Sequence, residues 1–379
     1  MTEPRRAEHP AMLCNLQALR AIAAYMVVVH HIGTGFVERS LGLAWPAVGA
    51  AGVDVFFVLS GVVMVYTVRG GRGDPAAFLQ RRILRIAPLY TLVTTVVFAL
   101  CLAGLQPQGL AQADGTLAQY LKSILYIPFA RANGPALPLV TVGWTLNYEA
   151  FFYLLFALAL TLRRQVPPAL AATALIAALV LAGIALPGQQ GLLVAFYTNP
   201  IMLEFAAGML IAAVLLGGAR GRRGDVARGG LLCTCGVVWF AATALLGIEV
   251  RLFDPQRAFF WGVPAAAIVA GALLLERGGV RLTSPALRLQ GDASYATYLV
   301  HLLVIQVAAR LLSLAFGAPD AAWAVWVQAG LFLALSAICG TILHLLVEVP
   351  LAKFIRNTEV KNEIPPLTFK LKQSYMNEH

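Results

Sequence analysis

The stretch LQALRAIAAYMVVVHHIG, Leu16 to Gly33, is typical of a membrane-spanning helix, yet it carries one arginine and two histidines. About 20 mostly apolar residues suffice to cross a bilayer as a helix. Ionisable side chains at the centre of a bilayer are costly, and they usually face the interior of a helix bundle or a water-filled cavity. We therefore expect this helix to direct its ionisable side chains toward neighbouring helices.

The rest of the chain has the same apolar character. Of its 379 residues, 59% are hydrophobic and 12% are charged, whereas a soluble domain has about 25% charged residues. The sequence therefore predicts an all-α polytopic membrane protein, a bundle of about ten transmembrane helices. The predicted spans are residues 13–34, 46–68, 86–105, 142–162, 168–186, 200–217, 230–247, 258–276, 291–316 and 323–347.

Basic residues are concentrated in the connections that follow even-numbered spans. Those connections contain Arg69, Arg72, Arg81, Arg82, Arg85, Arg163, Arg164, Arg220, Arg222, Arg223, Arg228, Arg277, Arg281 and Arg288, against Arg39, Lys122, Arg131, Arg251 and Arg257 in the others. An excess of Lys and Arg marks cytoplasmic loops, so both termini are predicted to be cytoplasmic. The formal net charge of +10 is then mostly a topology signal, and we expect no nucleic-acid partner.

The predicted organisation is one membrane domain with short ends. Residues 1–12 form a cytoplasmic N-terminal segment, residues 13–356 the membrane domain and residues 357–379 a polar cytoplasmic tail. Arg20 interrupts the first apolar run, which favours an uncleaved first span over a signal peptide. The mixed connection 106–141 is expected to contain a short interfacial or re-entrant segment. The five cysteines lack the paired spacing of a zinc site, so no metal is expected.

Arg20 and His31 are predicted to lie on one face of the first helix. Eleven residues separate them, which at about 100° and 1.5 Å per residue puts them within about 20° of each other and about 16 Å apart along the axis. His30 points away from that face. A snorkelling arginine and an interfacial histidine are an equally simple explanation for this helix taken alone.

Ionisable and polar residues recur in other spans. They are Asp54 in GVDVFFVLSG, the stripe Thr145, Glu149 and Tyr153 in WTLNYEAFFY, Glu204, the stripe Ser294, Tyr298 and His301 in GDASYATYLVHLL, and the pair His344 and Glu348. Gly61, on nearly the same face as Asp54, would allow close helix approach. Since several spans present such groups, we expect one shared polar cavity; a structural hydrogen-bond network is the open alternative. Tyr153, Ser294, Tyr298 and His301 are candidate substrate-binding residues.

A basic segment enters the third span. Arg82 and Arg85, in RGGRGDPAAFLQRRILRIAPLY, are three residues apart and so neighbours on a helix. Guanidinium forks suit phosphate oxygens. Ordinary positive-inside charge is the alternative, and it is the preferred explanation for Arg69 and Arg72.

Taken together, these segments resemble the acyltransferase-3 family of bacterial integral-membrane O-acyltransferases. The resemblance rests on Arg20-x10-His31, GVDVFFVLSG, Arg82-x-x-Arg85 with Pro88 and Tyr90, WTLNYEAFFY, SYATYLVH and Glu348-x-Pro350. These motifs follow one another from residue 15 to residue 350. The opening CNLQALRAIAAYMVVVHH is most similar to the exopolysaccharide O-acetyltransferase branch.

The resemblance implies transfer of an acyl group, usually acetyl from acetyl-CoA, to a hydroxyl of a carbohydrate or lipid-linked glycan, without a metal. It implies a multi-pass protein of the bacterial cytoplasmic (inner) membrane, in contact with membrane lipid. By motif, His31 is the expected catalytic residue with Arg20 as its partner, and Arg82 and Arg85 are the expected donor-binding pair. Asp54 and Glu149 complete the candidate catalytic set without individual roles.

Two mechanisms stay open at this point. His31 either removes the proton of the acceptor hydroxyl as a general base or carries the acetyl group as a covalent intermediate. A neighbouring carboxylate, Asp54 or Glu149, would favour its protonated form. The rival function is a secondary transporter of a polar solute, although the sequence shows no duplicated halves. A non-catalytic scaffold would leave the buried ionisable groups unexplained.

Overall fold

The computed structural model describes residues 13–68, 74–105, 115–131, 136–186, 191–216, 223–319 and 321–354. These residues form helices and connecting turns, without a β-strand in any of these ranges. The helices are α1 (Cys14–Ile32), α2 (Glu38–Leu41), α3 (Gly52–Thr67), α4 (Pro75–Leu102), α5 (Leu117–Ile124), α6 (Trp144–Thr161), α7 (Pro168–Ala185), α8 (Leu192–Tyr197), α9 (Leu203–Leu216), α10 (Asp225–Leu245), α11 (Val263–Arg277), α12 (Pro285–Asp292), α13 (Ser294–Phe316) and α14 (Ala322–Leu343). The all-α prediction is confirmed.

Ten helical segments of the described chain are long and apolar enough to cross a membrane. Their number and order match the prediction. The segments are Cys14–Leu41, Ala47–Thr67, Pro75–Leu102, Thr141–Thr161, Pro168–Ala185, Leu192–Leu216, Asp225–Leu245, Ala258–Arg277, Ser294–Phe316 and Ala322–Phe354. The predicted side of the membrane for each terminus stays a prediction.

The third span begins earlier than predicted. Helix α4 starts at Pro75 rather than near residue 86, because the Asp74 carboxylate accepts a hydrogen bond from the Ala77 backbone N–H and Pro75 occupies the first helical turn. Arg82 and Arg85 therefore lie on the body of this helix. The last span also continues past its predicted end, through a π-helical turn at His344–Glu348, to Phe354.

Some predictions fall outside the described residues. The segments 1–12 and 357–379, and Arg69, Arg72, Arg220 and Arg222, belong to this part of the chain. Within the connection 106–141, the described residues contain α5, a short helix beside α4. The short segment expected there is therefore a helix.

Small residues bring the central helices into close contact. A Cβ atom on Gly61 of α3 would lie 2.2 Å from the Phe205 carbonyl oxygen of α9, and one on Gly208 of α9 would lie 2.0 Å from the Val58 carbonyl oxygen. Only glycine fits at such a crossing. The expectation that Gly61 permits close helix approach is confirmed, and this contact fixes the position of α3.

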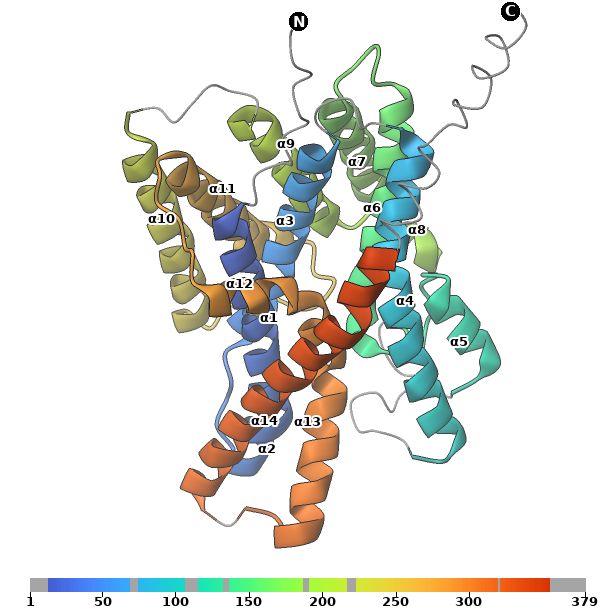
Figure 1. The fold of residues 1–379 in the computed structure, drawn as a ribbon, viewed down its shortest axis with the longest axis vertical. Helices are drawn as coiled ribbons and strands as arrows, with labels where there is room; N and C mark the ends of the chain where they lie inside the picture. The colour runs from blue at the N-terminus through green and yellow to red at the C-terminus, as the bar shows by residue number, and fades with distance from the viewer. Residues whose placement is uncertain are drawn as a thin grey trace, which may run out of the picture.

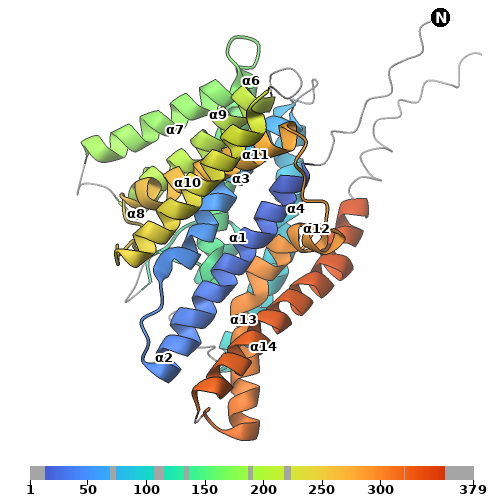
Figure 2. The ribbon, with the colours of Figure 1, turned by 90° about the vertical axis from the view of Figure 1, so that its left-hand side faces the viewer.

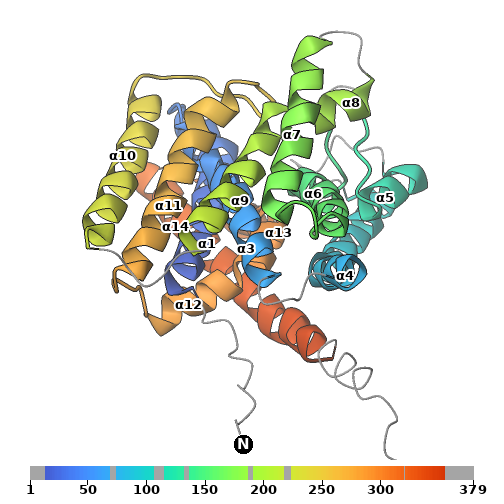
Figure 3. The ribbon, with the colours of Figure 1, turned by 90° about the horizontal axis from the view of Figure 1, so that it is seen from above.

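Seen from above, α1 and α3 lie near the centre, with α10 and α11 on one side and α4 to α8 on the other (Figure 3). Helix α14 crosses α13 diagonally, and the turn that follows α14 contacts α4 (Figure 1). The end of α13 and the start of α14 lie at one end of the molecule (Figure 2), and the first turns of α4 lie at the opposite end (Figure 1). This arrangement places α1, α3, α4, α6 and α13 around one internal space.

Candidate active site

The internal space is a cavity of about 110 Å³. Five helices line it: α1, α3, α4, α6 and α13. The polar and charged lining residues are Arg20, Ser60, Arg82, Arg85, Thr145, Glu149, Tyr153, Ser294, Tyr295 and Tyr298. The shared polar cavity expected from the sequence is therefore present, and it collects side chains from residues 20 to 298 of the chain.

Glu149 is the carboxylate of this lining. Ser60 donates a hydrogen bond to its Oε1 atom over 3.1 Å, and the Tyr153 hydroxyl donates to the same atom over 2.5 Å. Its Oε2 atom has no hydrogen-bond partner among the described residues, so one oxygen is held in place while the other remains available to the cavity. Fixing one oxygen in this way orients a carboxylate for contact with a bound molecule.

Three guanidinium groups line the same cavity as this carboxylate. Arg82 is 8% exposed, donates from Nη2 to Thr67 Oγ1 over 2.6 Å, and lies over the ring of Tyr153 with 6.0 Å between its Cζ atom and the ring centroid. Arg20 makes a long contact, 3.5 Å, from Nη1 to Gln17 Oε1. Arg85 is exposed. Three cations with one carboxylate make the lining positive, which suits an anionic ligand.

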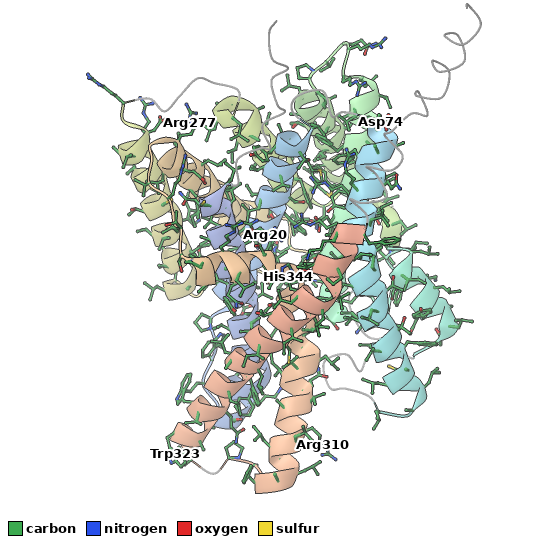
Figure 4. All side chains as sticks on the ribbon, viewed as in Figure 1. Arg20, Asp74, Arg277, Arg310, Trp323 and His344 are labelled. Atoms are coloured by element: carbon green, nitrogen blue, oxygen red, sulfur yellow. The ribbon has the colours of Figure 1, made fainter. Side chains whose placement is uncertain are left out.

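A second cavity of about 640 Å³ adjoins the first. Arg20, Arg85 and Tyr295 line both cavities, so these residues form the junction between them. The larger cavity lies between α1, α4, α12 and the end of α14, and Arg20 and His344 are near mid-height of the molecule (Figure 4). The His344 Nδ1 atom is 2.5 Å from Glu348 Oε2, as their spacing of one turn predicts.

The stripe on α13 is only partly open to the cavity. The Tyr298 hydroxyl donates to the Val142 carbonyl over 3.0 Å and lies 3.1 Å from Thr145 Oγ1. Ser294 Oγ donates to the Gly291 carbonyl over 2.7 Å. Both residues line the cavity, but their hydroxyl protons are engaged with the protein backbone, which leaves their oxygens as acceptors.

The histidines lie outside this lining. His301 is completely buried, and its Nε2 atom is 3.2 Å from Nδ1 of His31. Tyr298 connects them to the cavity, because it lines the cavity and its ring centroid is 6.0 Å from that of His301. Arg20 and His31 therefore lie on one helix but contact different groups, and the expected role of Arg20 as a supporting partner of His31 stays a prediction.

Asp54 is engaged in an ion pair away from the cavity. Arg257 donates from Nε to Asp54 Oδ1 over 3.0 Å and from Nη2 to Oδ2 over 2.8 Å, and the two side chains are 2% and 0% exposed. The guanidinium of Arg257 lies 4.6 Å from the ring centroid of Trp261. Neither Asp54 nor Glu149 contacts His31, so the expected carboxylate beside that histidine is replaced by His301.

Glu204 extends this buried cluster from α9. It is 2% exposed, and neither of its carboxyl oxygens has a hydrogen-bond partner among the described residues. Sequence reasoning missed Arg257, which the hydropathy pattern assigns to a loop; its position just before the apolar run AFFWG was the available signal.

The sequence was then compared with known proteins. The family described as "Acyltransferase domain" matches residues 15–345. The exopolysaccharide production protein ExoZ of Rhizobium meliloti (strain 1021) is 35% identical over 310 residues, which are 81% of this chain and 90% of the relative. The acyltransferase MdmB of Streptomyces mycarofaciens is 28% identical over 90% of this chain and 92% of its own length.

A third relative matches over a shorter part. The O-acetyltransferase OatA of Staphylococcus aureus (strain NCTC 8325 / PS 47) is 29% identical over 187 residues, 46% of this chain and 29% of that protein. No solved structure matches the fold of this chain.

Proposed function

Because the chain belongs to the acyltransferase family that matches residues 15–345, we propose that it transfers an acetyl group from acetyl-CoA to a hydroxyl of a cell-surface or exported carbohydrate, such as an exopolysaccharide. The similarity to an exopolysaccharide production protein and to an O-acetyltransferase supports this acceptor class and this acyl group. The ten candidate spans support a site within the bacterial cytoplasmic membrane.

One observation carries the proposal: three arginines and one glutamate converge on a small cavity that joins a larger one. CoA is a polyanion with a long uncharged arm that ends in the thioester. The larger cavity, with Arg81 and Arg85 in its wall, suits the phosphates. The smaller cavity then receives the arm and its acyl end, with Arg20 and Arg82 beside it.

His31 is the proposed base on the acceptor side. Its Nδ1 atom lies 2.9 Å from the Val27 carbonyl oxygen, so Nδ1 carries the proton and Nε2 carries the lone pair. That lone pair accepts the proton of the acceptor hydroxyl while its oxygen bonds to the acyl carbon and the carbon–sulfur bond to CoA breaks. In the alternative mechanism the same nitrogen takes the acyl group first and passes it to the acceptor.

The test uses purified protein in proteoliposomes with radiolabelled acetyl-CoA and de-acetylated exopolysaccharide. The wild-type chain should label the polysaccharide, and His31→Ala should lower the rate by about 100-fold or more, the usual contribution of a general base. His30→Ala is the matched control, because it removes the neighbouring imidazole of the same helix and leaves the His31–His301 contact in place. An unchanged rate in His31→Ala would remove the assignment. Solute uptake by the same vesicles, without any labelled product, would favour the transporter instead.

A trapping experiment separates the two mechanisms. Incubation with labelled acetyl-CoA and no acceptor should leave the protein unlabelled if His31 acts only as a base. Acid-labile label on the peptide that contains His31 would favour the covalent carrier.

A further inference from the structure

His301 is the side chain best placed to act on the proposed base. It lies on α13, 270 residues away from His31 in sequence, with 0% of its surface exposed. It does not line either cavity. The one side-chain hydrogen-bond contact that it makes in the described chain is with His31, which both cavity linings likewise omit, so we assign it to His31 in place of its expected role in substrate binding.

The hydrogen bonds of the two rings fix where their protons lie. His301 Nδ1 is 2.6 Å from the Tyr298 carbonyl oxygen, and His31 Nδ1 is 2.9 Å from the Val27 carbonyl oxygen. A carbonyl oxygen only accepts, so each Nδ1 atom must carry its proton. In a neutral His301, Nε2 then has the lone pair, and its partner over 3.2 Å is the Nδ1–H of His31.

Of the four ring nitrogens of the two histidines, the one not yet described is Nε2 of His31. It has no hydrogen-bond partner among the described residues, and with Nδ1 protonated it has the free lone pair that a general base or a nucleophile needs. When that nitrogen takes up a proton or an acyl group, positive charge spreads to Nδ1–H, and the acceptor already in place is His301 Nε2. The chain of hydrogen bonds ends at the Tyr298 carbonyl, so the proton is stabilised rather than carried away.

Few other groups near the two histidines could accept the Nδ1–H of His31 as positive charge develops on its ring. The titratable or charged neighbours of the pair are His30 on α1 and Tyr298 on α13, with Arg257 within electrostatic range of His30. His30 meets the His31 ring edge-on at 5.2 Å between centroids, and the Tyr298 hydroxyl is engaged with Val142. No carboxylate of the described chain contacts the pair.

We propose that His301 is a positioning residue that holds His31 with its Nε2 lone pair directed at the reacting group and accepts the Nδ1–H of His31 as charge develops. This inference rests on the proposed function, because it presupposes that His31 acts in acyl transfer. The role parallels that of the acid in a serine hydrolase triad, filled here by a neutral imidazole.

A pair of amide substitutions tests the role. In His301→Gln the amide oxygen occupies the place of Nε2 and can accept from His31, whereas in His301→Asn the shorter amide occupies the place of Nδ1 and cannot. We expect His301→Asn to lower kcat by about 10- to 100-fold, the range for a hydrogen bond to a charged group, with KM for acetyl-CoA unchanged. His301→Gln should recover most of kcat.

The outcomes are compared in protein that elutes as a single species in detergent and melts near the wild type. Equal kcat values for the Gln and Asn variants, or a loss that appears in KM, would overturn the positioning role. His31→Ala is measured in parallel. If it is inactive while the two His301 variants behave alike, only the positioning role fails; if it retains transfer, the assignment of His31 in the proposed function fails with it.

Discussion

Two buried charged regions of this protein differ in how their charges are satisfied. In the Asp54–Arg257 pair, both side chains are almost fully buried and every charge has an opposite charge within 3.0 Å. In the small cavity, Arg20, Arg82 and Glu149 take part in none of the ion pairs found in the described residues. The same residue types are therefore neutralised in one region and left available in the other.

The difference follows from the cost of moving a charge out of water. A buried ion is tolerated when a partner and further hydrogen bonds compensate its desolvation, and removal of one partner then leaves an isolated charge. Charges that line a cavity keep water or a ligand as their partner. We infer that the paired region maintains the fold, whereas the unpaired region is kept for an anionic substrate. Each of the following predictions challenges this division.

The largest effect is expected for Asp54→Ala. It leaves Arg257 buried without its carboxylate, which should lower the stability of the folded protein by about 3–5 kcal/mol. Thermal unfolding in detergent micelles measures this as a lower melting temperature. The double variant Asp54→Leu with Arg257→Met, which removes both charges, should recover much of the loss. A single variant that melts with the wild type would show that the pair does not maintain the fold.

Glu149→Gln should have the opposite profile. The substitution keeps the size of the side chain and removes the one carboxylate of the cavity lining, so we expect kcat to fall by about 100-fold, within the range of a lost acid–base or charge interaction. The melting temperature should stay close to that of the wild type, because Glu149 has no ion-pair partner that the substitution would leave buried without an opposite charge. A melting temperature lowered as far as in Asp54→Ala would mean that Glu149, like Asp54, maintains the fold.

Arg85→Ala is expected to act on donor binding alone. Arg85 is exposed and sits at the junction of the two cavities. Loss of a charge-assisted contact to phosphate should raise KM for acetyl-CoA by about tenfold, with kcat nearly unchanged. Arg228→Ala, an exposed arginine on α10 outside both linings, is the matched control. Equal KM values in the two variants would exclude Arg85 from donor binding.

The sequence predicted each helix better than it predicted contacts between helices. Hydropathy located ten spans, and helical spacing placed Glu149 and Tyr153 on one face. Spacing within one helix cannot say which distant residue will meet that face. The partners of Asp54 and His31 are Arg257 and His301, more than 200 residues away in sequence. Both pairings depend on how α3, α11 and α13 pack around α1.

The axial separation of Arg20 and His31 explains why the two side chains contact different groups. A shared face suggested that they act together, but about 16 Å along a helix is three turns, longer than either side chain can bridge. Arg20 therefore reaches the cavities while His31 reaches His301. The early start of α4, in contrast, was predictable, because Asp74 before Pro75 is a recognisable helix start.

The smallest effect is expected for Ser60→Ala, which tests how firmly Glu149 is held. The substitution removes the 3.1 Å hydrogen bond to Glu149 Oε1 and leaves the bond from Tyr153. A hydrogen bond to a charged group contributes about 1.5–3 kcal/mol, and Tyr153 still holds the same oxygen, so kcat should fall by a few-fold to about tenfold, less than in Glu149→Gln. In the double variant Ser60→Ala with Glu149→Gln, the Ser60 change should have little additional effect, because the oxygen that it orients no longer carries the charge. Fully additive losses would mean that Ser60 acts independently of Glu149, and the carboxylate of the cavity would then be held by Tyr153 alone.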